Sequence, residues 1–192
     1  ERPYLGIPEK DLEHERGLIT KSEVRAVSLS KLQLKKGMVL WDLGAGSGAV
    51  AIEAAGLIPG GQIYALEKNK ERAAQIRSNC VRFKVHNINV IGSRLPDGLD
   101  ELPDPDRIFV GGGGKALAAT LRKAINRMKA NGVMVVNTVL LDSMNTAVRM
   151  MKAGGLQTDL TQIQISRSRP MPTGDRMEAL NPVWIVRGVA SS

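Results

Sequence analysis

The chain has 192 residues, of which 43% are apolar and 24% charged, and its formal net charge is +8. These values are typical of an ordinary soluble protein with one folded domain and exclude a disordered chain, and two domains would be a tight fit. No apolar stretch approaches the roughly 18 residues needed to cross a bilayer. The basic and then apolar pattern of a secretory signal peptide is also missing.

Cys80 is the only cysteine, so no internal disulfide can form and a reducing, cytoplasmic compartment is expected. His14 and His86 stand alone without ligand spacing, and we therefore expect no metal site. The chain begins with Glu1 rather than Met, as a piece of a longer protein would. The expected layout is a single domain over 1–192, with 1–16 an extension or a linker from an upstream domain, 17–36 a leading helix region and 37–192 the sheet core.

The positive charge favours an anionic partner, which could be nucleic acid, a membrane surface or an acidic metabolite. A solvated basic surface without any such partner is an equally good interpretation. Proteins that bind single-stranded nucleic acid usually add aromatic side chains on which bases stack. The only aromatic residues here are Tyr4, Trp41, Tyr64, Phe83, Phe109 and Trp184, and several of them lie in strand-like runs and are better explained as core.

Apolar periodicity predicts alternating helices and strands. Ser22 is a plausible N-cap for the first helix, and the pairs Asn131-Gly132 and Gly154-Gly155 are typical helix stops. In chain order we expect a helix over 22–34, a strand over 38–43, a helix over 47–56, a strand over 62–66, a helix over 70–83, strands over 87–91 and 107–110, a helix over 115–129, a strand over 133–140, a helix over 143–152, an exposed edge strand over 156–166 and a last strand over 182–188.

This alternation predicts an α/β fold with a doubly wound, seven-stranded sheet. No helix separates the last two strands, so we expect them to form an antiparallel hairpin at one edge. Ligands of such sheets bind beyond the carboxyl ends of the strands, where strand order reverses. The turns that follow the strands are therefore the informative places.

The first turn reads VLWDLGAGSGAV, with Asp42 two residues before Gly44. Gly44, Gly46 and Ala49 also nearly fit the dinucleotide fingerprint, so NAD stays an alternative here. A carboxylate at the strand tip would repel a pyrophosphate, whereas it suits a ligand with ammonium and sulfonium charges such as S-adenosylmethionine. Glu67, at the second tip, is placed to accept hydrogen bonds from both hydroxyls of an adenosine ribose, which NAD enzymes also use. An exposed glutamate that merely starts a helix is the simpler alternative.

The third tip, with Ser93, Arg94 and Leu95, is where an adenine would lie in this architecture. The fourth tip is a run of four glycines within FVGGGGKA, residues 109–116. Glycine costs about 0.5–1 kcal/mol relative to alanine inside regular structure, so such a run needs a reason. A flexible surface connector is one explanation, and a bare floor for a wide, flat substrate is the other.

Four stretches resemble a known family: GLITKSEVRA at 17–26, WDLGAGSG at 41–48, LPDPDRIFVGG at 102–112 and NPVWIVRG at 181–188. The chain is similar to the decarboxylating precorrin methyltransferases of cobalamin biosynthesis. These occur as the carboxy-terminal domain of precorrin-6Y C(5,15)-methyltransferase and as a separate cobalt-precorrin-6B C15-methyltransferase. The resemblance covers 17–188. The glycine-rich turn is common to many methyltransferases, whereas GLIT together with PDRIFVGG is far more specific.

The resemblance implies a class I, Rossmann-like methyltransferase fold with an antiparallel final strand, and methyl transfer from S-adenosylmethionine to carbon 15 of a precorrin with loss of the ring C acetate carboxylate. It also implies a cytoplasmic homotetramer and, in the fused enzyme, an upstream precorrin methyltransferase domain. Relatives often read Gly-Asp-Ala-Pro at the third tip, so the acidic partner of the adenine amino group is missing here. The residues expected at the cofactor are Thr20, Asp42, Gly44, Ala45, Gly46, Ser47, Gly48, Glu67, Lys68, Ser93, Arg94, Leu95 and Gly111.

A methyl sulfonium is already electrophilic, so alignment in a dry cleft can supply most of the acceleration, and no catalytic residue is assigned. A precorrin carries many carboxylates, which arginines bind bidentately. The stretch 166–182, expected to join the last two strands, is therefore either a substrate loop or a solvated or subunit-contacting loop. The residues expected at the substrate are Gly112, Gly113, Arg167, Arg169 and Arg176.

Two other functions stay open. An RNA methyltransferase would suit the charge, although the fourth tip lacks the Asn/Asp-Pro-Pro-aromatic motif that grips a flipped base. A non-catalytic nucleotide-binding or assembly domain is the other alternative.

Overall fold

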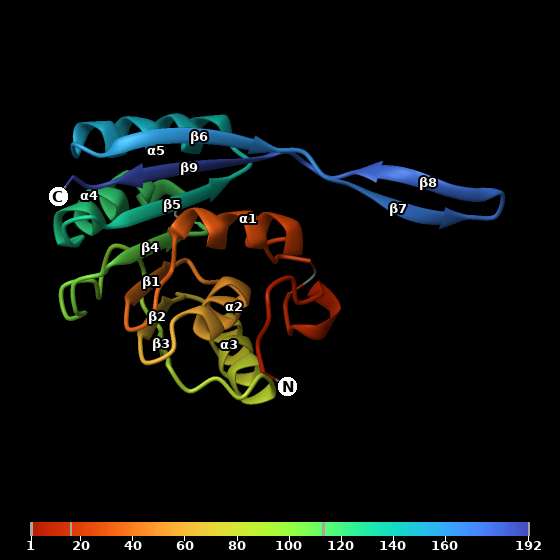
Figure 1. The fold of residues 1–192 in the computed structure, drawn as a ribbon, viewed down its shortest axis with the longest axis horizontal. Helices are drawn as coiled ribbons and strands as arrows, with labels where there is room; N and C mark the ends of the chain where they lie inside the picture. The colour runs from red at the N-terminus through yellow and green to blue at the C-terminus, as the bar shows by residue number, and fades with distance from the viewer. Residues whose placement is uncertain (1, 16, 113, 192) are drawn as a thin grey trace.

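The computed structural model describes residues 2–15, 17–112 and 114–191. A seven-stranded sheet with the order β3-β2-β1-β4-β5-β9-β6 forms its centre (Figure 1). The first five strands are parallel, and β9 lies between β5 and β6 and is antiparallel to both. The strands are β1 (Val39–Leu43), β2 (Gln62–Leu66), β3 (Ile88–Ile91), β4 (Arg107–Val110), β5 (Val133–Thr138), β6 (Gln157–Ile163) and β9 (Val183–Val189).

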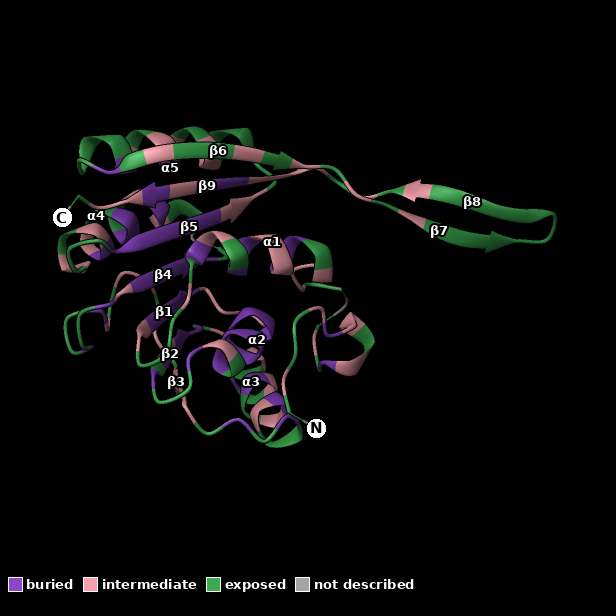
Figure 2. Ribbon diagram, in the orientation of Figure 1, coloured by how far each residue is buried: buried purple, intermediate pink, exposed green. Residues whose placement is uncertain are grey.

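Helices cover both faces of the sheet, because alternate strand residues point to opposite faces. In β1, Leu40 packs with the helices of one face and Trp41 with those of the other, and both side chains are fully buried. Figure 2 shows that the central strands β1, β4 and β5 are mostly buried. One face carries α1 (Ser22–Leu32), α2 (Ala49–Leu57) and α3 (Lys70–Arg82), and the other carries α4 (Leu117–Arg127) and α5 (Leu141–Ala153).

The predicted doubly wound sheet with an antiparallel final strand is confirmed. The element bounds differ from the predicted ones by a few residues. The strand predicted over 156–166 ends at Ile163, and the helix predicted over 115–129 begins as the 3-10 helix η2 (Gly114–Ala116) before α4.

Two local predictions are wrong. Ser22 is the first residue of α1 rather than its N-cap, because the carboxylate of Glu9 accepts the hydrogen bond from the Ser22 amide at 2.7 Å. The stretch predicted as a plain connection over 166–182 contains β7 (Ser166–Met171) and β8 (Gly174–Ala179). These strands form a separate antiparallel ribbon that projects from the body of the molecule (Figure 1).

The segment before α1 packs against the domain through the 3-10 helix η1 (Glu9–Asp11) and its neighbours. Ile7 and Leu12 are buried in the same cluster as residues of α1 and α2. Within the described ranges, the helices are too short or too polar for any of them to cross a membrane.

Candidate functional site

A cleft of about 1060 Å³ opens at the carboxyl ends of β1, β2, β4 and β5. The segment 17–21 before α1 and residues 180 and 181 before β9 complete its wall. The structure thus brings together turns that are far apart in the sequence. The predicted residues that line the cleft are Thr20, Gly44, Ala45, Gly46, Ser47, Glu67, Lys68, Ser93, Arg94, Leu95, Gly111 and Gly112.

The turn after β1 is held by backbone contacts that need glycine. The amides of Gly44 and Ala45 both donate to the Leu66 carbonyl at 3.0 Å, which joins this turn to β2. Gly44 has a φ of +74°, and a Cβ there would lie 3.1 Å from the Gly112 carbonyl oxygen. The tips of β1 and β4 therefore meet with bare backbone on both sides.

Gly48 does not line the cleft, and its role is packing. It precedes α2 with a φ of +76°, and a Cβ there would lie 2.8 Å from Cγ2 of Ile76 on α3. This glycine lets α2 and α3 approach each other. Its position does not support the prediction that it contacts the cofactor.

Glu67 reaches into the cleft from the tip of β2 and is only 5% exposed. Its Oε2 accepts a hydrogen bond from the Gly46 amide at 3.0 Å, and its Oε1 accepts one from the Asn69 amide at 2.9 Å. These bonds fix the carboxylate against the glycine turn. Each oxygen has a second lone pair, so the group can still accept hydrogen bonds from a vicinal diol such as a ribose.

Asp42 lies beneath the cleft rather than on its wall. It is fully buried on β1, and neither carboxylate oxygen has a hydrogen-bond partner among the described residues. The pKa of Asp42 is raised from 3.8 to about 7, mainly by burial and to a smaller extent by the nearby charge of Glu67, while the backbone of Ala51 offsets part of the rise. Asp42 is not among the residues that line the cleft, so its expected place beside an ammonium or sulfonium charge stays a prediction that this position does not favour.

The glycines at the tip of β4 differ in their surroundings. A Cβ on Gly111 would lie 3.2 Å from the Phe109 ring and 3.3 Å from the Gly44 carbonyl, so this residue is needed for close packing. Gly112 is exposed at the cleft, and a Cβ there would meet nothing within 4 Å. Of the run, Gly114 has a positive φ of +48°, and Gly113 lies outside the described residues.

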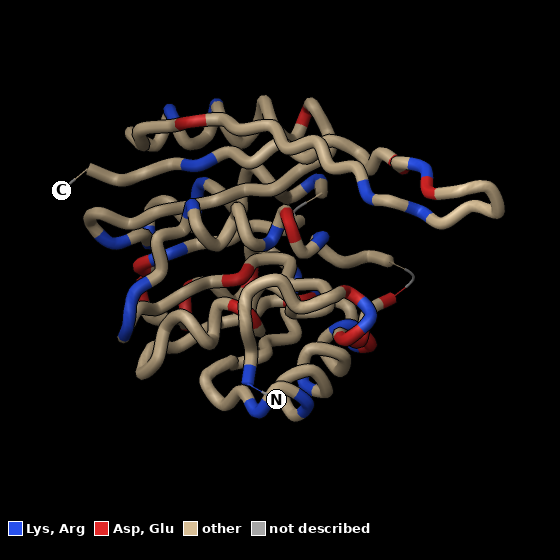
Figure 3. Tube along the Cα trace, turned by 45° about the vertical axis from the view of Figure 1, so that its right-hand side comes forward, with Lys and Arg blue, Asp and Glu red and all other residues tan. Residues whose placement is uncertain are grey.

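The three arginines expected at the substrate do not line the cleft. Arg167 donates hydrogen bonds to the carboxylates of Glu9 and Glu23, and it lowers the pKa of Glu9 to about 2. Arg169 and Arg176 both pair with Glu178 on the ribbon, where Figure 3 shows charges of both signs. The ribbon carries these side chains away from the carboxyl ends of the sheet strands. A sequence prediction that treats 166–182 as a connection does not place them there.

Other cations line the cleft instead. Lys21, Lys68, Arg94 and Lys115 have no ion pair or side-chain hydrogen bond with any residue in the described ranges. Glu67 is the sole acidic side chain among the described lining residues. Sequence reasoning missed Lys21 and Lys115, although each directly adjoins a turn that it had singled out.

Asn137, at the end of β5, is a further polar residue of the cleft that the sequence did not reveal. Its Nδ2 donates to Ser28 Oγ at 2.7 Å, and Ser28 Oγ donates to the Val24 carbonyl at 2.7 Å. Because the serine has a single proton, it can only accept from Asn137, which fixes the orientation of the amide. The Asn137 Oδ1 is left without a partner among the described residues.

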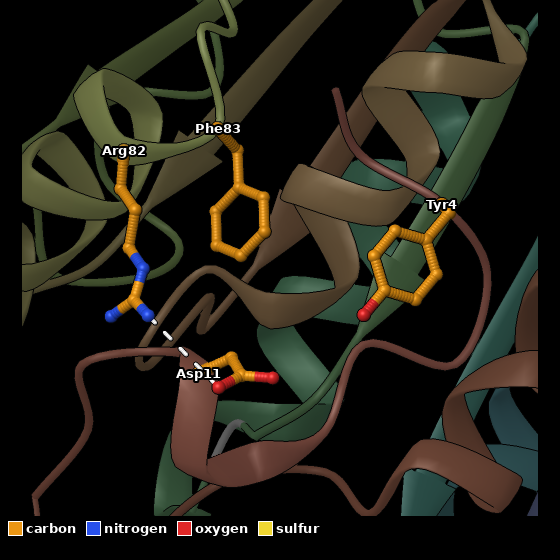
Figure 4. Close-up of a pocket in the computed structure, with 4 residues that line it drawn as sticks. All are labelled: Tyr4, Asp11, Arg82 and Phe83. Carbon is orange, nitrogen blue, oxygen red and sulfur yellow. Dashed lines mark ion pairs between the residues drawn. The ribbon is translucent and has the colours of Figure 1, made fainter. Parts of the chain in front are cut away.

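A second cavity, of about 480 Å³, lies between the N-terminal segment and the end of α3. Figure 4 shows Arg82 directed toward Asp11, at 4.0 Å, beside the ring of Phe83. No predicted site residue lines this cavity. In the described part of the chain, no group of three or more His, Cys, Asp or Glu residues could hold a metal ion.

We expect the replacement Asp42→Asn to stabilise the protein increasingly as the pH rises from about 4 to 7. Over this range the Asp42 carboxyl ionises in the unfolded chain but stays protonated in the fold, so the parent loses stability as the pH rises. An asparagine cannot ionise. Between pH 4 and pH 7, the free energy of unfolding of the variant should therefore rise relative to that of the parent by about 4 kcal/mol. Urea unfolding at several pH values measures this difference. Asp97→Asn, at an exposed site where the carboxylate has no ion pair with a described residue, is the matched control. A difference independent of pH would contradict the prediction.

Comparison with known proteins agrees with this geometry. The family model described as a precorrin methyltransferase domain matches residues 11–188. The probable cobalt-precorrin-6B C(15)-methyltransferase (decarboxylating) of Pyrobaculum calidifontis is 39% identical over 98% of both chains. The crystal structure of precorrin-6y C5,15-methyltransferase from Geobacter metallireducens covers 97% of this chain, and the match covers 99% of that one, with 39% identity and a TM-score of 0.93.

The fold alone is shared more widely. A SAM-dependent O-methyltransferase from Thermotoga maritima is 17% identical, with a TM-score of 0.77 over 92% of this chain and 68% of that chain. The expected methyltransferase fold is thereby confirmed, and the match over nearly the whole length is far more specific than the fold. The chain belongs to the precorrin methyltransferase family.

Proposed function

We propose that the chain catalyses the S-adenosylmethionine-dependent methylation of a precorrin at carbon 15, with decarboxylation of the ring C acetate, in cobalamin biosynthesis. The names of the relatives and the family membership support this reaction. The observation that supports the substrate class is the cleft itself, where four of the described lining cations have no ion pair with another described residue and Glu67 is the one described acidic side chain. A polycarboxylated macrocycle has the complementary charge.

The residues of the cleft fit S-adenosylmethionine. The turn of Gly44–Ser47 leaves backbone room for the methionine part, because a Cβ on Gly46 would point into open space. Glu67 holds the ribose hydroxyls, Ser93, Arg94 and Leu95 border the adenine, and Thr20 closes the cleft from the segment before α1. S-adenosylmethionine supplies the electrophilic methyl group.

The protein's contribution is alignment and exclusion of water. The sheet fixes the tips of β1, β2 and β4, so the cofactor turn and the glycine floor keep a constant separation, and this orientation can supply most of the acceleration. The cations of the cleft hold the substrate carboxylates, and the conjugated macrocycle accepts the electrons that decarboxylation releases. No general base is required for the methyl transfer in this scheme.

We also propose a cytoplasmic homotetramer. The edge strand β6 offers unpaired backbone groups, and the ribbon of β7 and β8 is exposed along almost its whole length. Small and apolar residues such as Ser168 and Met177 face each other on one side of the ribbon, which suits a subunit contact.

Light scattering at micromolar concentration should give about four times the mass of the 20.7 kDa chain. A monomeric mass would contradict this assembly.

Replacing Glu67 by Ala should weaken the binding of S-adenosylhomocysteine by about 1–3 kcal/mol, because the ribose hydroxyls would lose their acceptor. Titration calorimetry of parent and variant measures the change, with Glu71→Ala on the exposed side of α3 as the matched control. Equal affinity for variant and parent would contradict the ribose role. Tighter binding of NAD, or of a short RNA, by the parent would overturn the proposed cofactor or substrate class.

The variant Gly112→Val should lower methyl transfer and carbon dioxide release by orders of magnitude, while its affinity for S-adenosylhomocysteine changes by less than about tenfold. The open space at Gly112 means that the side chain would stand in the cleft without disturbing the fold. Gly92→Val is a matched control, because that position is equally open but does not line the cleft. Circular dichroism and the melting temperature check folding.

Normal turnover of the folded Gly112→Val variant would mean that the run is only a connector. Loss of the cofactor as well would mean that the glycines belong to the methionine pocket and that the macrocycle lies elsewhere.

A further inference from the structure

Three consecutive apolar side chains are exposed where β5 passes into α5. Val139, Leu140 and Leu141 have exposed fractions of 51%, 61% and 58%. Such a run on the surface of a folded protein usually has a function, because water disfavours it. Val139 and Leu140 line the cleft, so this apolar surface is continuous with the site described above.

The turn that presents these side chains is held firmly by its own backbone. The Leu140 amide donates to Thr138 Oγ1 at 3.0 Å, and the Leu140 carbonyl accepts from the Met144 amide at 3.0 Å. The peptide groups of Leu140 are therefore fixed on both sides while its side chain projects into solvent. A ligand that covers it need not first order the turn.

Leu18 also lines the cleft and, like Val139 and Leu140, is largely exposed, at 57%. It lies two residues before Thr20, whose carbonyl accepts a hydrogen bond from the buried guanidinium of Arg25. Leu18, Val139 and Leu140 are hereafter called the apolar ledge. Lys115, without a partner among the described residues, lies in η2 just after the glycine run and lines the same cleft.

An occupant of the ledge must combine an apolar face with negative charge. S-adenosylmethionine is a cation overall, and its single carboxylate could neutralise at most one of Lys115 and Lys21. A flat macrocycle with carboxylates on its rim meets both requirements at once: its face can cover the leucines while its carboxylates reach the lysines.

We propose that the apolar ledge receives one face of a tetrapyrrole macrocycle and that Lys115 pairs with a carboxylate on its rim. This inference rests on the proposed function and assigns substrate contacts within the same site. The ledge then sets the position of the macrocycle over Gly112, and Lys115 contributes mainly through charge.

The test uses uroporphyrin, a planar tetrapyrrole with carboxylates on its rim, as the probe. Its affinity is measured by fluorescence titration of the whole chain saturated with S-adenosylhomocysteine, over a range of salt concentrations.

Leu140→Ser should weaken uroporphyrin binding at least about tenfold with the same salt dependence, because buried apolar area is lost. Lys115→Gln should weaken binding at low salt and reduce the salt dependence, because a screened ion pair is lost. Leu5→Ser, at an exposed leucine away from the cleft, and Lys129→Gln, at a lysine paired with Asp106, are controls and should match the parent.

Unchanged uroporphyrin affinity in Leu140→Ser and Val139→Ser would overturn the ledge and leave the proposed function standing. If the parent binds S-adenosylhomocysteine but not uroporphyrin, the ledge and the proposed substrate class fall together. If Leu140→Ser lowers the mass measured by light scattering, the surface is a contact between copies of the chain and the proposal is wrong. Affinity for S-adenosylhomocysteine and the melting temperature show whether each variant is folded.

Discussion

A buried ion pair between Arg25 on α1 and Glu53 on α2 holds together the parts of the chain that form the cleft. Both side chains are fully buried, and the shortest distance between them is 2.7 Å. Glu53 Oε1 also accepts from the Ile7 amide, and Arg25 donates to the carbonyls of Thr20 and Ile7. Removing one partner of such a pair typically costs about 3–5 kcal/mol, because the other charge is left buried. The segment that bears Thr20 and Leu18 is therefore held against α1 and α2 through this pair.

The opposite wall of the cleft depends on close approach of backbone rather than on charge. Gly44 and Gly112 meet across the tips of β1 and β4, and Glu67 ties the Gly46 amide to β2. A side chain at Gly44 would separate these two strands, because its Cβ would lie 3.1 Å from the Gly112 carbonyl oxygen. The described lining of the site accordingly combines bare glycine backbone, the carboxylate of Glu67 and several cationic side chains.

The net charge of +8 is distributed in two different ways. On the ribbon, Arg169 and Arg176 are compensated by Glu178, and Arg167 is compensated by Glu9 and Glu23, which secures the base of the ribbon to the N-terminal segment and α1. In the cleft, Lys21 and Lys115 have no partner among the described residues. The excess of basic residues in the sequence is thus informative only where the fold leaves it uncompensated.

The sequence by itself determined the order of helices and strands, the doubly wound sheet and the turns that meet at its carboxyl edge. These features follow from apolar periodicity and from glycines at strand tips, which are local properties of the chain. It could not reveal that Asp42 is buried below the turn, since a carboxylate at a strand tip can face either the cleft or the helix beneath. Nor could it show that β7 and β8 carry three arginines away from the cleft, while Lys21, Lys115 and Asn137 line it. Those outcomes depend on which elements pack together and which charges become paired, and only the tertiary structure decides that.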